Sequence, residues 1–197
     1  MSVTEMTGSY IAEHFASHQR VIEQCFARLL GEAEAAGRAL TDALRGGGKV
    51  LAFGNGGSAT QASHLVGELL GRFKDTRQPF PALVLSSDPG TVTCIANDFG
   101  YDALFERQAR ALAQPGDVAV GFTTSGRSEN VRRGLDAARA RGAVTVALVG
   151  GAGLIGGSAD HVLAVPSDST AHVQEVHLML LHVWCILIDE ELGQVEA

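Results

Sequence analysis

A short glycine-rich stretch, GNGGS at positions 54–58, has the composition of a loop that binds an anion through its backbone. It follows the apolar run from Val50 to Phe53, so the glycines come where a buried strand turns into a helix. The backbone N–H groups at such a point face outward, and the helix dipole favours negative charge. The stretch therefore predicts a site for an anion of the size of phosphate.

A second stretch of this kind, TTSGRS at positions 123–128, follows the apolar run from Val118 to Phe122. Its hydroxyl side chains and its glycine precede a helix that we expect from about Glu129. Because hydroxyl and N–H donors can surround three oxygens at once, this composition suits a phosphate monoester. A simple helix N-cap would need only one Ser or Thr.

The sequence GNGGSA also fits the pattern G-x-G-x-x-A of dinucleotide-binding folds, so a nicotinamide or flavin dinucleotide is a competing interpretation. Asp88 would then be the acid that binds the ribose. It lies farther along the chain than the roughly 20 positions that the pattern expects. The second anion loop favours a phosphate ester over a dinucleotide.

His64 and Glu68 are four residues apart in a helical segment that starts at the GNGGS loop. This spacing places an imidazole and a carboxylate on one helix face, where they can share a metal ion or a proton. An arbitrary pair of this kind is more often a surface contact. Here its position, about one to three turns from the anion loop, favours a chemical role.

Gln174, His177 and His182 interrupt an apolar helical run near the C-terminus. A single histidine in such a run is more often a hydrogen-bonded core residue than a ligand. On a continuous helix Gln174 and His182 would be separated by ~12 Å, at ~1.5 Å per residue, which is at the limit of reach for one ion. We therefore expect that the helix starts after Gln174, or that these residues reach a site from different subunits. The apolar face beside them favours subunit packing, with Glu68 and His182 supplied by different chains.

The whole chain has 197 residues, 46% hydrophobic composition and a formal net charge of -7. The length and composition favour one domain with a substantial core. Scattered Lys and Arg residues argue against a nucleic-acid or anionic-membrane surface and leave a small ligand or a protein as partner. The longest apolar run, at 178–188, is shorter than the ~20 residues that a bilayer span needs, so we expect a buried helix.

The three cysteines, Cys25, Cys94 and Cys185, are far apart and include no C-x-x-C pair. Neither a disulfide framework nor a cysteine zinc site is indicated, and the cytoplasm is the expected compartment. The N-terminal residues lack the basic and apolar regions of a signal peptide.

Apolar residues recur at helical spacing over positions 9–45, which predicts two helices broken near Gly31. Buried strands are expected at 50–53, 82–85, 118–122, 144–149 and 162–165, with helical segments between most of them and a glycine-rich loop at 150–160. Strands that alternate with helices indicate an α/β fold with a parallel sheet covered on both faces. We expect a single domain over 1–197, made of a helical segment at 1–46 and an α/β core at 47–197.

Four segments together resemble the sugar isomerase domain family and, within it, the sedoheptulose 7-phosphate isomerases. They are GKVLAFGNGGSATQASHLVGELLGRF, CIANDFGYDALF, GFTTSGRSENV and VQEVHLMLLH. Each motif alone is weak, but the conjunction of NGGS, H-x-x-x-E, NDFG, TSG-x-S and Q-E-x-H-x4-H is specific. The chain departs from the family pattern at Gln61, Gly67, Ala171 and His172.

The resemblance implies a five-stranded parallel sheet in a cytoplasmic homotetramer with active sites between subunits. It implies Zn²⁺ on His64, Glu68, Gln174 and His182. It places a sugar phosphate on Asn55, Gly56, Gly57, Ser58, Glu68, Asn97, Asp98, Thr123, Thr124, Ser125, Ser128 and Gln174.

The implied reaction converts D-sedoheptulose 7-phosphate to D-glycero-D-manno-heptose 7-phosphate through an enediol, as the first step towards a nucleotide-activated heptose. A carboxylate at Glu68 suits the base, and an imidazole at His182 suits proton movement between the two oxygens. The alternative is a non-catalytic sugar-phosphate-binding protein that acts as a regulator or as an adaptor for a replication initiator. The complete set of metal-type ligands favours the enzyme.

Overall fold

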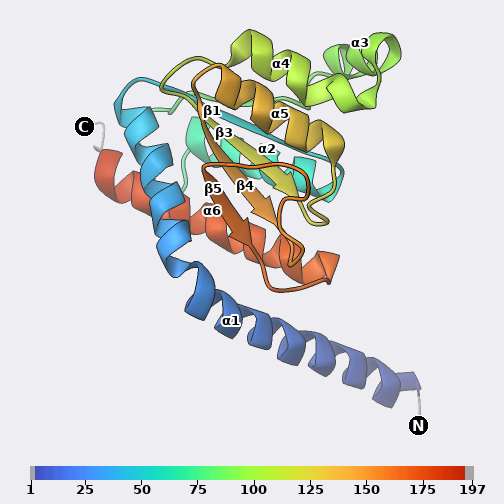
Figure 1. The fold of residues 1–197 in the computed structure, drawn as a ribbon. Helices are drawn as coiled ribbons and strands as arrows, with labels where there is room; N and C mark the ends of the chain where they lie inside the picture. Colours follow the sequence, from blue (N-terminus) through green and yellow to red (C-terminus); the bar gives the residue numbers. More distant parts are fainter. Residues whose placement is uncertain (1–2, 194–197) are drawn as a thin grey trace.

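Five parallel strands form one sheet in the order β2-β1-β3-β4-β5 in the computed structural model, which describes residues 3–193 (Figure 1). All five expected strands are confirmed, and their bounds are β1 Val50–Gly54, β2 Ala82–Val84, β3 Val118–Thr123, β4 Val144–Val149 and β5 His161–Ala164. The helices are α1 Val3–Arg45, α2 Gly57–Leu70, α3 Pro89–Phe99, α4 Leu104–Leu112, α5 Glu129–Ala140 and α6 Thr170–Leu192, with the 3-10 helix η1 Tyr101–Ala103 before α4.

Side chains of successive strand residues enter two different cores. In β1, Val50 and Ala52 pack with α1, α2 and α6, whereas Leu51 and Phe53 pack with residues of α4 and α5. Because side chains alternate between the faces of a strand, a run that is apolar at every position can be buried on both sides. This explains why the strands read as continuous apolar runs in the sequence.

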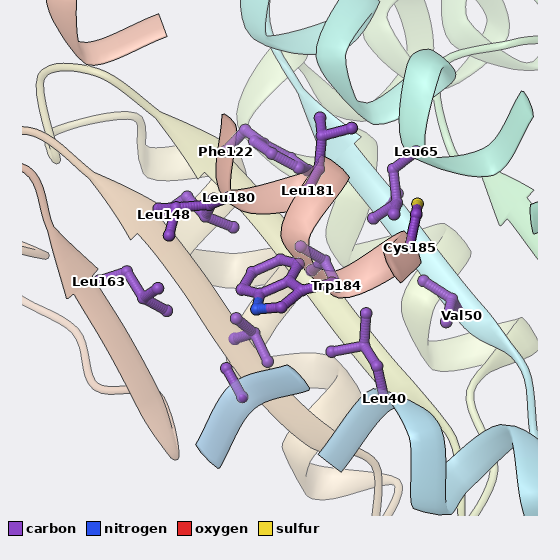
Figure 2. Packing of buried hydrophobic residues seen from close by; sticks show 14 of the residues in the cluster. Leu40, Val50, Leu65, Phe122, Leu148, Leu163, Leu180, Leu181, Trp184 and Cys185 are labelled. Atoms are coloured by element: carbon purple, nitrogen blue, oxygen red, sulfur yellow. The ribbon is translucent and has the colours of Figure 1, made fainter. Parts of the chain in front are cut away.

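Helix α6 packs between α1 and α2 on one face of the sheet, and Trp184 lies in the core that they share (Figure 2). The indole is fully buried and donates from Nε1 to the carbonyl of Ala33 at 2.9 Å. α6 is long and apolar enough to cross a membrane, with a hydropathy of 1.4, but half of its most apolar stretch is buried inside the protein. Its apolar composition therefore serves the core, as the sequence predicted.

Helix α1 continues through Gly31, so the prediction of two helices broken at this residue is wrong. A glycine inside a helix costs only about 1 kcal/mol relative to alanine. Leu29 and Ala33, on either side of Gly31, are buried in the core that α1 shares with α6. Burial of one leucine side chain contributes about 1.5–3 kcal/mol, which is enough to offset the glycine.

Helix α6 begins at Thr170 and includes Gln174, so the expectation of a helix that starts after Gln174 is also wrong. The helix runs without interruption to Leu192. The segment 150–160 has no helix or strand and forms the expected loop.

Strands β1 and β3 are neighbours in the centre of the sheet, with Val50 beside Val118. The helices that follow them cover opposite faces, since α2 packs in one core and α5 in the other. The loops after β1 and β3 therefore diverge at the same sheet edge, where ligands bind in open α/β folds. Both anion loops expected from the sequence lie at this point.

Candidate active site

The loop after β1 leads directly into α2 at Gly57, and no side chain caps this helix. Gly56 has φ +54, a left-handed conformation that glycine adopts without a steric penalty. A Cβ on Gly57 would lie 2.6 Å from Nε2 of Gln174, so a larger residue here would displace the Gln174 side chain from this loop. Ser58 is buried at the start of α2. The helix N-terminus thus keeps its positive dipole end free for an anion.

The side chain of Asn55 connects the two anion loops. Its amide exchanges two hydrogen bonds of 2.9 Å with Asn130, which is buried at the start of α5. The hydroxyl of Tyr101 donates to Oδ1 of Asn55 at 2.8 Å. These contacts fix the loop after β1 against the start of α5.

The loop after β3 holds its hydroxyl groups near the N-terminus of α5. Oγ1 of Thr123 lies 3.0 Å from Oγ of Ser128, and the backbone N–H of Arg127 donates to Oγ of Ser125 at 3.2 Å. Ser128 occupies the N-cap position, but its side chain makes no cap hydrogen bond. The first N–H groups of α5 therefore remain available to a ligand.

Gly126 shapes this loop, with φ +67 and its α-carbon close to the carbonyl of Gly153. A Cβ there would lie 1.8 Å from that oxygen, so only glycine fits. Beside the loop is a cavity of about 220 Å³ lined by Thr124, Ser125, Arg127, Gly151, Ala152, Asp168 and Thr170. The cavity joins the loop after β3 to the start of α6.

Three metal-type ligand atoms meet at one point between α2 and α6. Nε2 of His64 lies 3.1 Å from Oε1 of Glu68 and 3.0 Å from Nε2 of His182, and all three atoms lie within 4.8 Å of one another. Ligands of a tetrahedral zinc ion, with bonds of ~2.0 Å, lie roughly 3.3 Å apart. The donor set and its spacing therefore fit zinc. All three residues belong to one chain, so the expectation that Glu68 and His182 come from different chains is wrong.

Cys185 is buried next to this cluster but is not suited to bind the metal. Burial, followed by the negative charge of Glu68, raises the pKa of its thiol to about 12. Because the thiolate is the form that binds metals, the thiol stays inert at neutral pH.

Arg77 closes the C-terminal end of α2 beside Glu68. Its guanidinium donates to the carbonyls of Glu68 at 2.8 Å and Leu69 at 3.1 Å, and Nε donates to Asp189 of α6 at 2.6 Å. Hydrogen bonds from a charged donor to these carbonyls satisfy groups that a helix end leaves without partners. The position of Glu68 therefore depends on α6 as well as on α2.

Helices α2 and α6 run side by side in the same direction. Gly57 lies against Gln174 near both N-termini, His64 contacts His182 farther along, and the bond from Arg77 to Asp189 joins the C-terminal ends. Nε2 of Gln61 donates to the carbonyl of Gln174 at 2.5 Å. Gln174 therefore lies at the first anion loop, whereas His182 lies at the metal-type cluster.

Asn97 and Asp98 lie exposed at the end of α3, where Nδ2 of Asn97 donates to Oδ1 of Asp98 at 2.8 Å. Among the residues that the structure describes, neither side chain forms a hydrogen bond to an anion loop.

The sequence model of the SIS domain matches residues 13–150. This chain belongs to the SIS domain family. A phosphoheptose isomerase from Solidesulfovibrio magneticus is 46% identical over 187 residues, which are 95% of this chain and 90% of the relative. One from Aquifex aeolicus is 49% identical over 152 residues, which are 77% of this chain and 80% of the relative.

The solved structure of a phosphoheptose isomerase from Neisseria gonorrhoeae matches with a TM-score of 0.86 at 36% identity. The match covers 93% of this chain and 99% of that chain. The α/β fold and the family resemblance inferred from the sequence are thus confirmed.

Sequence reasoning missed the residues that hold the site in place. Asn130 and Tyr101 orient Asn55, and Arg77 holds the end of α2. Asn130 had a detectable signal, since it lies two residues after the TSGRS stretch, in the first turn of the next helix. Arg77 lies in a polar segment without periodicity, and only the fold brings it to Asp189.

Proposed function

We propose that this chain is a phosphoheptose isomerase that converts D-sedoheptulose 7-phosphate to D-glycero-D-manno-heptose 7-phosphate. The observation that carries the proposal is the meeting of Glu68, His64 and His182 on helix α2 and its neighbour α6, where α2 itself begins at an anion loop. A phosphate site and an acid/base pair on one rigid element are what a sugar-phosphate isomerase needs. The names of the relatives support the same activity.

The substrate phosphate would bind at the start of α5. Hydroxyls of Thr123, Thr124, Ser125 and Ser128 and the free N–H groups of this helix can surround its oxygens. Asn55 and the glycines of the first loop would bind the sugar hydroxyls, with Asn97 and Asp98 as further contacts. Because Asn97 and Asp98 are exposed on α3, they are free to reach a site shared with a second subunit.

Glu68 would act as the base. It takes the proton from C1 of the ketose, which leaves an enediol, and returns the proton to C2 on the same face. His182 would move a proton from the C1 hydroxyl to the C2 oxygen, since imidazole can donate and accept near neutral pH. The proton count balances, and no external oxidant or reductant is needed.

His64, Glu68 and His182 would hold Zn²⁺ when Glu68 and His182 are not transferring protons, whereas Gln174, expected from the sequence as the fourth ligand, lies at the first anion loop instead. When bound, zinc supplies a Lewis acid that polarises the carbonyl oxygen. The chain's own contribution is to keep both imidazoles and the carboxylate at fixed positions on two parallel helices.

We also propose that the chain forms a cytoplasmic homo-oligomer, with a tetramer as the expected state. Large apolar side chains on α1 are exposed, including Phe15 at 72% and Phe26 at 71%. Phe26 also lines an apolar groove of about 170 Å³ with Met179 and Val183 of α6. A contiguous exposed apolar surface of this kind is typical of subunit interfaces.

The decisive experiment is NMR of the protein with sedoheptulose 7-phosphate in deuterated water, with and without added Zn²⁺. The expected result is an aldose phosphate that carries deuterium at C2, because the Glu68 proton exchanges with solvent before its return. Binding of the sugar phosphate without any aldose would instead indicate the regulator or adaptor. Thermal stabilisation by a nicotinamide dinucleotide would support the dinucleotide alternative.

A further inference from the structure

A second cluster of imidazoles surrounds one carboxylate near the N-terminal end of α6, where Glu175 lies about two helical turns before His182 of the candidate active site. His14 and His18 are four residues apart on α1, and His172 and Glu175 are three apart on α6. These spacings place both members of each pair on one helix face. The contacts of His182 with α2 lie farther along α6 than this cluster.

All three histidines approach the carboxylate of Glu175. Nε2 of His14 lies 2.9 Å from Oε1, Nδ1 of His18 lies 2.8 Å from Oε2, and Nδ1 of His172 lies 3.1 Å from Oε2. The ligand atoms of His14, His172 and Glu175 all lie within 4.8 Å of one another. The imidazole rings of His14 and His172 have centroids only 4.5 Å apart.

Ser17 determines the tautomer of a neutral His172, whose Nδ1 faces the carboxylate of Glu175. The hydroxyl of Ser17 donates to the carbonyl of His14 at 2.9 Å, so it accepts from Nε2–H of His172 at 2.9 Å. Nδ1 of a neutral His172 then presents a lone pair to the oxygen of Glu175. Two acceptors at 3.1 Å repel each other unless a proton or a metal cation lies between them.

His18 gives an independent indication that a cation is needed beside Glu175. Its Nδ1 is buried and makes no hydrogen bond to any residue that the structure describes, although Glu175 is only 2.8 Å away. Buried polar groups are nearly always satisfied. A metal-bound imidazole typically donates its other N–H to an oxygen, as His172 does to Ser17.

We propose that His14, His18, His172 and Glu175 bind a divalent transition-metal ion that joins α1 to α6. Three imidazoles and one carboxylate are the ligand class that Zn²⁺, Co²⁺ and Ni²⁺ favour. Helical bundles also hold metals in their cores with ligands from packed helices, and here each of the two helices supplies two ligands. The ion would fix the part of α1 that extends beyond the body of the protein (Figure 1). This site is separate from the proposed catalytic zinc and does not depend on isomerase activity.

Co²⁺ is the appropriate probe because its visible absorption reports coordination by nitrogen ligands. We would remove bound metals from the full chain carrying His64→Ala and His182→Ala, which lacks the active-site cluster, and then titrate Co²⁺ alone. The expected result is one Co²⁺ per chain. Added Co²⁺ should also slow amide hydrogen exchange in α1 around His14 and His18.

In this background His14→Ala and His18→Ala should each weaken Co²⁺ binding at least about tenfold. Alanine favours helix, and His14 is half exposed, so this variant keeps α1 intact. The matched control is His161→Ala, which removes a histidine paired with only one carboxylate, Glu32 at 3.0 Å. It should bind Co²⁺ as its parent does. A parent that binds no Co²⁺, or binding that survives both α1 variants unchanged, would overturn the proposal.

Discussion

His64 and His182 face each other through their Nε2 atoms at 3.0 Å, although 118 positions separate them in the sequence. Glu68 contacts the same nitrogen of His64 at 3.1 Å. Either a shared proton or a metal ion satisfies two ring nitrogens in this arrangement. Proton transfer and metal binding are therefore linked at this point, and substitutions here should affect them differently.

Glu68→Gln should lower the isomerisation rate by about 10²- to 10⁴-fold, the usual contribution of a general base. The amide has nearly the same shape but cannot accept the carbon-bound proton. Binding should persist, and thermal stabilisation by sedoheptulose 7-phosphate would measure it. Glu190→Gln, an exposed acid near the end of α6, is the control and should turn over normally. Comparable turnover in the Glu68 variant would exclude this residue as the base.

Ser125→Ala and Ser128→Ala should each raise KM about tenfold, since a hydrogen bond to a charged group contributes about 1.5–3 kcal/mol. Zinc content, measured by elemental analysis, should not change, because these hydroxyls lie at the phosphate loop. Ser158→Ala, which removes a hydroxyl bonded to Arg139, provides the control. Loss of zinc in either loop variant would show that we have placed the two subsites incorrectly.

Stability should fall between pH 6.5 and pH 4 because of His177. Burial lowers the pKa of this imidazole from 6.5 to about 4, and its bond to the carbonyl of Val149 opposes the shift only in part. The unfolded chain therefore binds the proton first as the pH falls. The stabilising effect is complete above pH 6.5 and is lost towards pH 4, and it amounts to about 3 kcal/mol.

Urea unfolding of wild type and His177→Leu at several pH values would measure this contribution. Leucine cannot titrate, and the carbonyl of Val149 keeps its bond from the N–H of Val165. The difference in unfolding free energy between the two proteins should change by about 3 kcal/mol over this pH range. A constant difference would mean that His177 does not titrate in the way that its burial implies.

Phe26→Glu should shift the protein from an oligomer towards a monomer, measured by light scattering. A charge in the apolar groove between α1 and α6 would remain unpaired at a subunit contact. Leu112→Glu, at an exposed apolar position on α4, serves as the control and should leave the mass unchanged. A wild-type protein that is already monomeric would refute the proposed assembly.

The sheet was predictable because each strand is apolar at most positions, and both anion loops followed from their places after β1 and β3. The continuity of α1 was not predictable, since the stabilisation that outweighs Gly31 comes from α6, far along the chain. The position of Gln174 depends on close contact with Gly57, which periodicity does not reveal. Periodicity also does not reveal the cluster around His172, because its partners His14 and His18 lie on another helix.

The parallel course of α2 and α6 has a consequence for the protein without its substrate. The start of α2 at Gly57 lies beside Gln174 in the first turns of α6, so the positive ends of the two helix dipoles lie close together and repel each other. An anion in the loop relieves this repulsion. We therefore expect inorganic phosphate or sulfate in the surrounding solution to stabilise the fold itself, so that resistance to heat depends on the ionic composition of the medium even when no sugar is present.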